Sequence, residues 1–552
     1  MNAKASIGII LAFAVLFGYL QVKRAPNDLL SHDGWSRVAG VVVGKAGIRV
    51  LALNRSLSHQ DGSSAQANPP VALMGPHLSV AGNFKVTAKM EGIRSIGSLR
   101  LYGKPPVVYD QWRYETGSVR VDVATSSVSV FVWDGTSSSP TDMRAFPLPL
   151  QGTVLLSISH VNDLLYVSIN ETYLGSIPDH GIFLSEEVWF GVEATDASWM
   201  LTSLTAEGVE GGSVEVVEPP SLLVPQVKEG SLRSLASALV RPISIGTAVS
   251  FETLVFDLTY RTVVFEQFNS ITTENGFKPQ FIHPQKEMYA FEEMNMLVDS
   301  SLANEAIVHG HALVYAKSNP QWMNEVSVAG RKSVMTEHIE KIVGHFKGRV
   351  AGWDVVNEPL SNKKAPYKDG GDGLEETIWY EAMGEEYIDI AFRAAHEADP
   401  QAVLYINDYG LERDGERWDA LISLLLRLKE RGVPIHGVGF ESHVYGDGDY
   451  SDVKVLMRHM KILADMGLLV RISEIDVTGD NEKEQINQYV LALDACLKSP
   501  NCTGYTTWGV TDRYGSTTRS DRYPLVFGTS LLWDTDMEAK PAVTSIQNRL
   551  RQ

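Results

Sequence analysis

Cysteine, positive charge and long apolar runs are all scarce in this chain of 552 residues. Its only cysteines are Cys496 and Cys502, which are either two buried thiols or one disulfide around the turn at residues 499–501. The 48 lysines and arginines are outnumbered by 67 aspartates and glutamates, which gives a formal net charge of −19. This shortage of positive charge argues against nucleic acid or an anionic membrane surface as the main partner.

Only one apolar run has the character of a targeting segment. It extends from Ile7 to Leu20, after Lys4 and before the Lys-Arg pair at 23–24. Its length is typical of the core of a signal peptide and is short for a membrane-spanning helix. No small-x-small cleavage motif follows the run, so an uncleaved anchor stays open. We therefore expect residues 1–27 to be a signal peptide or a membrane anchor, and the protein to be secreted or anchored at the cell surface.

Residues 31–210 show almost no helical periodicity. Apolar and polar side chains alternate instead, for example at 84–90, 118–123 and 127–132, and turn residues separate these runs. Many short strands with this spacing predict an all-β sandwich of the jelly-roll type, a possible carbohydrate-binding module. The closing run at 188–194 resembles the last strands of lectin-like jelly rolls. Residues 211–228, which are rich in glycine and proline, are expected to be a linker.

Residues 229–552 have a different pattern, in which strand-like and helical stretches alternate eight times. The helical stretches include 334–346, 418–428 and 453–466, where apolar residues recur at steps of three and four. Eight strand–helix pairs predict an α/β fold of the TIM (β/α)8 barrel type. The chain should therefore carry a β-sandwich domain followed by a barrel domain.

Two of the predicted barrel strands end on carboxylates. Glu358 closes the segment 353–359 (WDVVNEP), and Glu474 lies in the segment 471–477 (RISEIDV). Catalytic residues of barrels lie at the C-terminal ends of strands, so these two glutamates can face each other across one pocket. A facing carboxylate pair is what retaining glycoside hydrolysis requires. One carboxyl must be ionised and the other protonated, and repulsion between close carboxylates can supply that difference.

The two segments also resemble the signatures of glycoside hydrolase family 10, a family of endo-β-1,4-xylanases. The resemblance covers residues 229–552 and includes five further segments in the family's order: 271–275 (ITTEN), 309–314 (HGHALV), 407–409 (NDY), 442–443 (SH) and 507–512 (TWGVTD). It implies a retaining endo-β-1,4-xylanase, which hydrolyses xylan by double displacement through a covalent glycosyl-enzyme intermediate.

The resemblance further implies roles for individual residues. Glu358 matches the general acid/base, and Glu474 matches the nucleophile. His443 and Asp476 match the groups that orient the nucleophile. Contacts to the substrate are expected from Glu274, Asn275, Lys278, His311, Asn357, Glu441, His443 and Trp508. Members of the family often have a cysteine pair at this place, which favours the Cys496–Cys502 disulfide.

Several positions depart from the family pattern. Glu441 stands where the family has glutamine, Tyr315 and Ala316 replace a Trp-His pair, and Ser516 replaces a tryptophan that closes the roof of the pocket. A third carboxylate raises the pKa of neighbouring carboxyls or replaces an amide contact by a charged acceptor. The smaller residues leave room for a bulkier sugar. The alternative function is therefore the same mechanism on another β-glycan or on decorated xylan.

A different class of protein is also consistent with parts of the sequence, namely a non-catalytic polysaccharide-binding protein. The presence of Glu358, Glu474, Asn357 and His443 argues against it. His309 lies two residues before the expected sugar ligand His311, but no third metal ligand appears at a useful spacing. We therefore expect no metal and no cofactor, and a polysaccharide, either xylan or a related β-glycan, as the partner.

Overall fold

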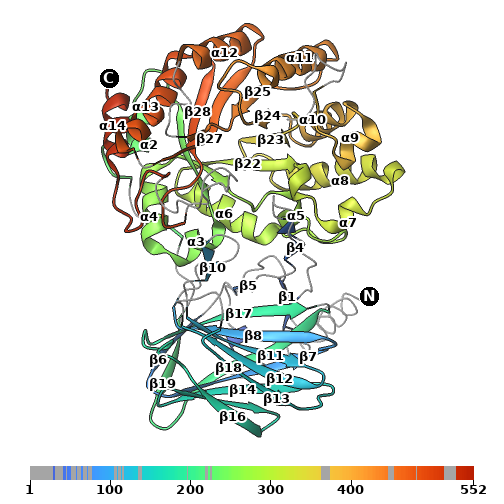
Figure 1. Ribbon diagram of the computed structural model, residues 1–552, viewed down its shortest axis with the longest axis vertical. Coiled ribbons are helices and arrows are strands. Elements are labelled where there is room, and N and C mark those ends of the chain that lie inside the picture. The colour runs from blue at the N-terminus through green and yellow to red at the C-terminus, as the bar shows by residue number, and fades with distance from the viewer. Residues whose placement is uncertain are drawn as a thin grey trace, which may run out of the picture.

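The computed structural model describes residues 29–31, 41–44, 47–50, 57–58, 64–65, 71–72, 77–104, 108–109, 113–114, 117–134, 140–195, 197–217, 222–223, 227–361, 373–445, 453–479, 481–514 and 530–552. The expected targeting segment 1–27 and Ser516 lie outside these residues. Figure 1 shows two parts, an all-β part coloured blue to teal and a larger part coloured green to red in which strands alternate with helices.

The N-terminal part is built mainly from two large antiparallel sheets, as the alternating sequence predicts. Two further short strand pairs are β3 Leu57–Ser58 with β4 Ser64–Ala65, and β9 Val108–Tyr109 with β10 Arg113–Tyr114. The strands of the two large sheets run in the orders β1-β2-β18-β7-β14-β15-β16 and β13-β12-β11-β8-β17-β6-β19, and β5 also pairs with β17. The bounds are β1 Val41–Gly44, β2 Gly47–Val50, β5 Val71–Ala72, β6 His77–Ala81, β7 Phe84–Glu91, β8 Ile96–Tyr102, β11 Ser118–Ala124, β12 Ser127–Trp133, β13 Asp142–Pro147, β14 Val154–Val161, β15 Leu164–Ile169, β16 Thr172–Pro178, β17 Glu187–Thr195, β18 Trp199–Gly208 and β19 Ser213–Val217.

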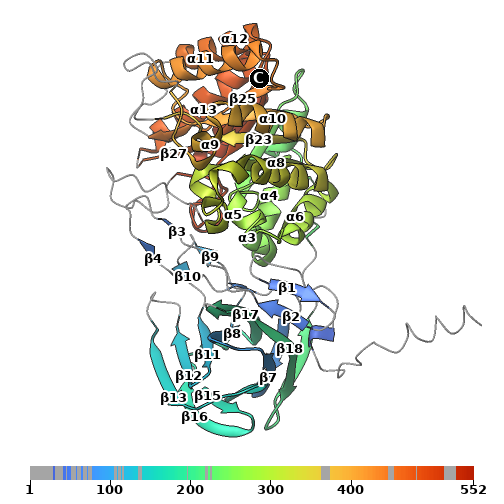
Figure 2. The ribbon, with the colours of Figure 1, turned by 90° about the vertical axis from the view of Figure 1, so that its right-hand side faces the viewer.

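The core of the sandwich follows from the period of two along each strand. In β7, Phe84, Val86, Ala88 and Met90 are fully buried, whereas the residues between them are only partly buried. Successive side chains of a strand point to opposite faces of the sheet, so one face packs inward and the other faces out. Figure 2 shows the sheets from the side, with β7 and β18 in one and β11 and β12 in the other.

The expected linker at 211–228 is wrong at its N-terminal end. Residues 213–217 form β19, which pairs with β6 from Ser213 opposite Ala81 to Val217 opposite His77. This segment alternates like a strand, and the edge of β6 offers it unpaired backbone groups. The sandwich therefore extends through Val217.

The C-terminal part is the predicted TIM barrel. Its parallel strands pair in the order β20-β21-β22-β23-β24-β25-β27-β28, and pairing of β20 with β28 closes the barrel. A short strand, β26, continues strand six and pairs with β27. The bounds are β20 Ser244–Val249, β21 Ser270–Thr273, β22 Ile307–Val314, β23 Gly352–Asn357, β24 Val403–Asp408, β25 Gly437–Phe440, β26 His443–Tyr445, β27 Leu469–Thr478 and β28 Cys502–Thr507.

Helices surround this barrel and bury their apolar faces against it. In α11, for example, Leu421, Leu424, Leu425 and Leu428 are fully buried, at the spacing of one helical face. The bounds are α2 Leu232–Ser237, α3 Phe251–Phe256, α4 Leu258–Gln267, α5 Pro279–Ile282, α6 Phe291–Ala303, α7 Gln321–Asn324, α8 Val328–His345, α9 Ile378–Met383, α10 Glu386–Ala398, α11 Glu416–Glu430, α12 Val453–Asp465, α13 Glu482–Lys498 and α14 Pro541–Leu550. Among the described residues, no helix combines the length and apolar character needed to cross a membrane.

The two cysteines form a disulfide, so the alternative of two buried thiols is wrong. Cys496 near the end of α13 is joined to Cys502 at the start of β28. The guanidinium of Arg241 donates to the carbonyl oxygens of Cys496, Leu497 and Cys502. A cation at the C-terminal end of a helix interacts favourably with the partial negative charge of its last carbonyl groups. Disulfide and arginine together hold the connection that leads into the last barrel strand.

Candidate active site

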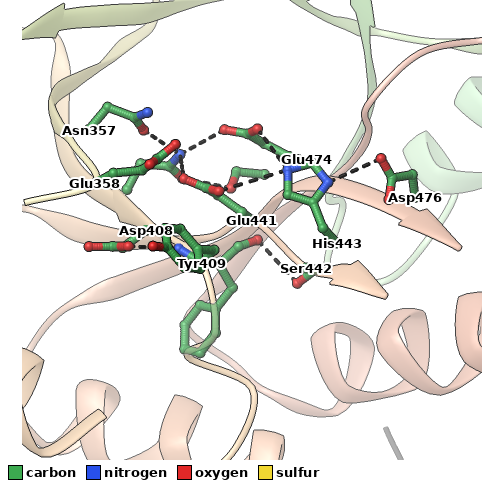
Figure 3. A network of polar contacts seen from close by, with 12 residues as sticks. Asn357, Glu358, Asp408, Tyr409, Glu441, Ser442, His443, Glu474 and Asp476 are labelled. Carbon is green, nitrogen blue, oxygen red and sulfur yellow. Dashed lines mark hydrogen bonds and ion pairs between the residues drawn. The ribbon is translucent and has the colours of Figure 1, made fainter. Parts of the chain in front are cut away.

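The expected site residues meet at the C-terminal rim of the barrel. Asn357 is the last residue of β23, and Glu358 follows it directly. Glu441 follows β25, and Glu474 lies in the second half of the long strand β27. Parallel strands place their C-terminal ends on the same rim, which explains why residues far apart in the chain converge. Figure 3 shows the carboxyl groups of Glu358, Glu441 and Glu474 directed toward one another.

Glu474 is a buried carboxylate surrounded by donors. Its Oε1 accepts a hydrogen bond of 2.8 Å from Nδ2 of Asn407, and its Oε2 lies 3.3 Å from Nε2 of His443. Nδ1 of His311 is 3.7 Å from Oε1. Burial by itself raises the pKa of Glu474, but His311, His443 and the nearby Lys278 outweigh it and hold the pKa below the ordinary value. The side chain is therefore ionised at neutral pH, as a nucleophile requires.

Glu358 has a different environment. Its Oε1 accepts a 2.8 Å hydrogen bond from the phenol of Tyr315, and its Oε2 contacts the ammonium of Lys317. The backbone φ of Glu358 is +50°, a value that non-glycine residues rarely adopt. Its amide is held by a 2.8 Å bond to the carbonyl of Asn407. Strained backbone of this kind is frequent where a fold must aim a functional side chain.

His443 connects Glu474 to a second carboxylate. Nδ1 of its ring is 3.1 Å from Oδ2 of Asp476, on the side away from Glu474. Burial lowers the pKa of His443, but Asp476 and Glu474 more than reverse this effect and raise the pKa well above its ordinary value. The imidazolium that results donates from both nitrogens, so it orients Glu474 and is itself oriented by Asp476.

His311 is held by an aspartate for which the sequence offered no role. Its Nδ1 is 2.9 Å from Oδ2 of Asp354, and Oδ1 of the same carboxylate is 2.9 Å from Nε2 of His309. Burial, with a further contribution from Arg471, lowers the pKa of His309 to about 4, so this ring is neutral at neutral pH. His309 therefore lies beside Asp354 as a neutral ring, and His311 lies between Asp354 and Glu474.

The remaining expected sugar contacts lie around the same place. Lys278 donates a 3.1 Å bond to Oδ1 of Asn275, and its Nζ lies 5.6 Å from the ring centre of Trp508. Trp508 packs edge-to-face against His311, with ring centres 5.2 Å apart. Glu274 and Asn275 follow β21 directly, on the neighbouring part of the rim. The structure thus brings the expected set together, while their roles toward a sugar stay predictions.

Asn407 is the residue that joins these groups. Its Nδ2 lies 2.8 Å from Oδ1 of Asn357 and 2.8 Å from Oε1 of Glu474, and its Oδ1 accepts a 2.6 Å bond from Ser473. The hydroxyl of Ser473 fixes which end of the amide is the oxygen. Sequence reasoning noticed Asn407 only as part of a motif, and it missed Tyr315 and Lys317 as partners of Glu358. The feature of the sequence that could have pointed to these three residues is their position at or just after the end of a predicted barrel strand.

Two sets of described side chains have the composition of a metal site, namely His160, Asp163 and Asp179 in the sandwich and a second set in this site. Donor atoms of Glu441, His443 and Glu474 all lie within 4.8 Å of one another. A metal requires a lone pair on the imidazole, and both nitrogens of His443 face carboxylates to which a cationic ring donates. We therefore assign no metal to these residues.

A TIM barrel with two glutamates on the ends of its fourth and seventh strands, one buried among donors and one partly exposed, defines a glycoside hydrolase. The model of glycosyl hydrolase family 10 matches residues 231–549, and the chain belongs to this family.

The comparisons identify relatives of the barrel domain. Endo-1,4-beta-xylanase B of Thermotoga neapolitana is 33% identical over 331 residues, covering 58% of this chain and 92% of the relative. A beta-1,4-xylanase of Dictyoglomus thermophilum is 33% identical over 305 residues, or 52% and 83% of the two chains. Among solved structures, native xylanase 10B from Thermotoga maritima has 34% identity and a TM-score of 0.53, covering 58% and 98%. Xylanase 10B from Thermotoga petrophila, in complex with xylobiose, has 32% identity and a TM-score of 0.54, covering 59% and 100%.

Proposed function

We propose that this protein is a retaining endo-β-1,4-xylanase. The observation that carries the proposal is the difference between the two carboxyl groups. Glu474 is buried among donors that favour its ionised form, as a nucleophile requires, and Glu358 is partly exposed at the end of another strand, where it can exchange a proton with a leaving group and with water. Double displacement requires these two roles, a nucleophile and an acid/base. The xylanases among the relatives support xylan as the substrate.

In the first step, the carboxylate of Glu474 attacks the anomeric carbon of the sugar. The glycosidic C–O bond breaks, and Glu358 gives its proton to the departing oxygen. The product of this step is a sugar joined to Glu474 by an ester bond. His443 and Asn407 hold Glu474 in position for the attack through the hydrogen bonds described above.

In the second step, Glu358 acts as a base. It takes a proton from water, whose oxygen attacks the anomeric carbon and displaces Glu474. Two inversions give net retention at the anomeric carbon, and both glutamates return to their starting protonation states. His311, Lys278, Asn357 and Trp508 are proposed to hold the sugar that is cleaved, because they surround Glu474.

Release of reducing sugar from different polysaccharides tests this function. We expect the purified full chain to act on xylan faster than on cellulose or mixed-linkage glucan, and to hydrolyse an aryl β-xylobioside. A Glu474→Ala variant is the control for contaminating activity. Absence of hydrolysis of every one of these substrates would leave the non-catalytic polysaccharide-binding protein as the better assignment.

A second substrate class, other β-glycans or decorated xylan, is favoured by one observation. Ala316 is small and only partly buried, and it stands where the sequence pattern of the family has histidine. More space near the cleaved sugar admits an extra hydroxymethyl group or a substituent. Comparison of aryl β-xylobioside with aryl β-cellobioside decides between the two classes, because a glucose-tolerant pocket gives similar values of kcat/KM for both.

We also propose that the sandwich is a carbohydrate-binding module and that the protein is secreted or anchored at the cell surface. Tyr166 and the exposed Tyr173 lie on the outer face of the sandwich with ring centres 6.2 Å apart, and sugar rings stack on such aromatic faces. In the inactive Glu474→Ala background, Tyr173→Ala should weaken binding to insoluble xylan. Unchanged binding would argue against this face as the binding site.

A further inference from the structure

The third carboxylate of the site, Glu441, has an environment unlike that of Glu474. Its side chain is almost fully buried, with 3% of the residue exposed. Oε1 is 3.3 Å from Nδ2 of Asn407, and Oε2 is 3.8 Å from Nε2 of His443. Both donors lie closer to other acceptors, because Asn407 is 2.8 Å from Glu474 and His443 is 3.3 Å from Glu474.

The hydrogens of Asn407 and His443 point mainly to acceptors other than Glu441. Nδ2 of Asn407 carries two hydrogens and has three acceptors, of which Asn357 and Glu474 are the nearer two. The amide cannot turn round, because its oxygen accepts from Ser473. The Nε2 hydrogen of His443 is likewise nearer to Glu474. The donors of the site therefore stabilise charge on Glu474 and leave little for Glu441.

The charges around Glu441 also disfavour its ionised form. Negative groups face it from three strands or strand ends: Glu474 on β27, Glu358 after β23 and Asp408 on β24. His443 on β26 is the nearest cation, and it is shared with Glu474 and Asp476. More distant cations, Lys317, Arg417 and Lys278, also interact electrostatically with Glu441. Their hydrogen bonds, however, go to Glu358, Asp408 and Asn275. A buried carboxylate beside another carboxylate is costly when the donors around it lie closer to other acceptors.

We propose that Glu441 holds a proton in the working enzyme and, in this neutral form, acts as a positioning residue for Glu474. The inference rests on the proposed function. As a carboxylic acid, Glu441 has the shape and neutrality of glutamine. If it ionised, it would compete with Glu474 for Asn407 and His443, and the nucleophile would lose the donors that hold it. Burial, reinforced by Glu474 and Glu358, raises the pKa of Glu441 well above its ordinary value, in agreement with the geometry.

The test is the pH dependence of kcat/KM for 2,4-dinitrophenyl β-xylobioside. Dinitrophenolate leaves without a proton, so ionisation of Glu358 does not limit this substrate. The wild type should lose activity on the alkaline side, and Glu441→Gln should move that limb upward by about one pH unit or more. Glu441→Ala should be less active and should show the same shift.

A matched control is Glu412→Gln. Glu412 is another carboxyl with a pKa raised by burial, but it accepts hydrogen bonds from the amide and hydroxyl of Ser442 and has no contact with Asn407 among the described residues. This variant should keep the alkaline limb of the wild type. An unchanged limb in Glu441→Gln and Glu441→Ala, with an active wild type, would overturn the inference and leave the proposed function intact.

Stability gives a second measurement that needs no activity. A carboxyl whose pKa is higher in the folded than in the unfolded protein binds more protons when folded. It therefore lowers the free energy of unfolding as pH rises from the unfolded pKa toward the folded pKa. The wild type should lose stability relative to Glu441→Gln across this range, measured by denaturant unfolding. Parallel curves would show that Glu441 is already ionised and would contradict the inference even in an inactive protein.

Discussion

The phenol of Tyr315 donates a 2.8 Å hydrogen bond to Oε1 of Glu358, across the rim between β22 and β23. Burial and the charge of Glu358 raise the pKa of Tyr315 far above its ordinary value, so the phenol keeps its hydrogen and stays a donor. This hydrogen bond fixes the position of Oε1 of Glu358, the proposed acid/base. The other oxygen, Oε2, contacts Lys317 and can change its hydrogen-bond partner during the reaction.

Removing this donor should slow the cleavage of xylan. We expect Tyr315→Phe to lower kcat/KM about 5-fold, since the phenol positions the protonated acid and a hydrogen bond between neutral groups contributes about 0.5–1.5 kcal/mol. Dinitrophenyl β-xylobioside should be less affected, because its leaving group needs no acid. Tyr405→Phe is the control, since that phenol contacts Thr503 instead. Equal losses on both substrates would indicate a structural role for Tyr315.

The two glutamates should be distinguishable by chemical rescue. Glu358→Ala should cripple hydrolysis of xylan but spare substrates with good leaving groups, and added azide should give a β-glycosyl azide. Glu474→Ala should lose the double-displacement route, and azide should give at most the α-product. The anomeric configuration is read by NMR of the product. An α-azide from the Glu358 variant would exchange the roles of the two residues.

His443 should change its titration when Asp476 is neutralised. Burial lowers the pKa of His443, and Asp476 is the largest influence that raises it, so Asp476→Asn should make the ring lose its proton at lower pH. The raised pKa contributes stability that is complete below the unfolded value of about 6.5 and is lost as pH rises through the folded pKa. The variant should therefore lose stability at neutral pH.

Proton NMR of the His443 ring checks this titration. The control is Asp179→Asn, which disrupts the pair between His160 and Asp179 in the sandwich, 3.1 Å apart, and should leave His443 unchanged. If His443 titrates identically in wild type and Asp476→Asn, then Glu474 alone sets its charge.

Loss of the disulfide should destabilise the barrel. Replacing Cys496 and Cys502 by serine should lower the free energy of unfolding by about 2 kcal/mol, because the closed loop is short. Denaturant unfolding of the double variant measures the effect, and alkylation of the unreduced wild type followed by mass measurement checks the bond. Two alkylated thiols in the purified wild type would show that the bond does not form.

The order of strands and helices, the two glutamates proposed as catalytic and the cysteine pair could be inferred from the sequence, because each rests on local periodicity or on a motif a few residues long. Glu358 follows, and Glu474 lies within, a strand that an apolar, β-branched run of the sequence already predicts. β19 was missed because glycines and prolines flank this short alternating segment, as in a linker, and its partner β6 is far away in the chain.

The protonation and partners of the site residues depend on the tertiary structure. The contact of Tyr315 with Glu358 joins residues 43 apart, and that of Asn407 with Glu474 joins residues 67 apart. Closure of the barrel decides which strand ends meet, and burial then decides which carboxyl receives the donors. The sequence alone therefore determined that three carboxylates line this rim. Only the folded barrel determined that Glu474 has the shorter contacts to Asn407 and His443 and Glu441 the longer ones, because the stability of a charge depends on its distance to its partners and to water.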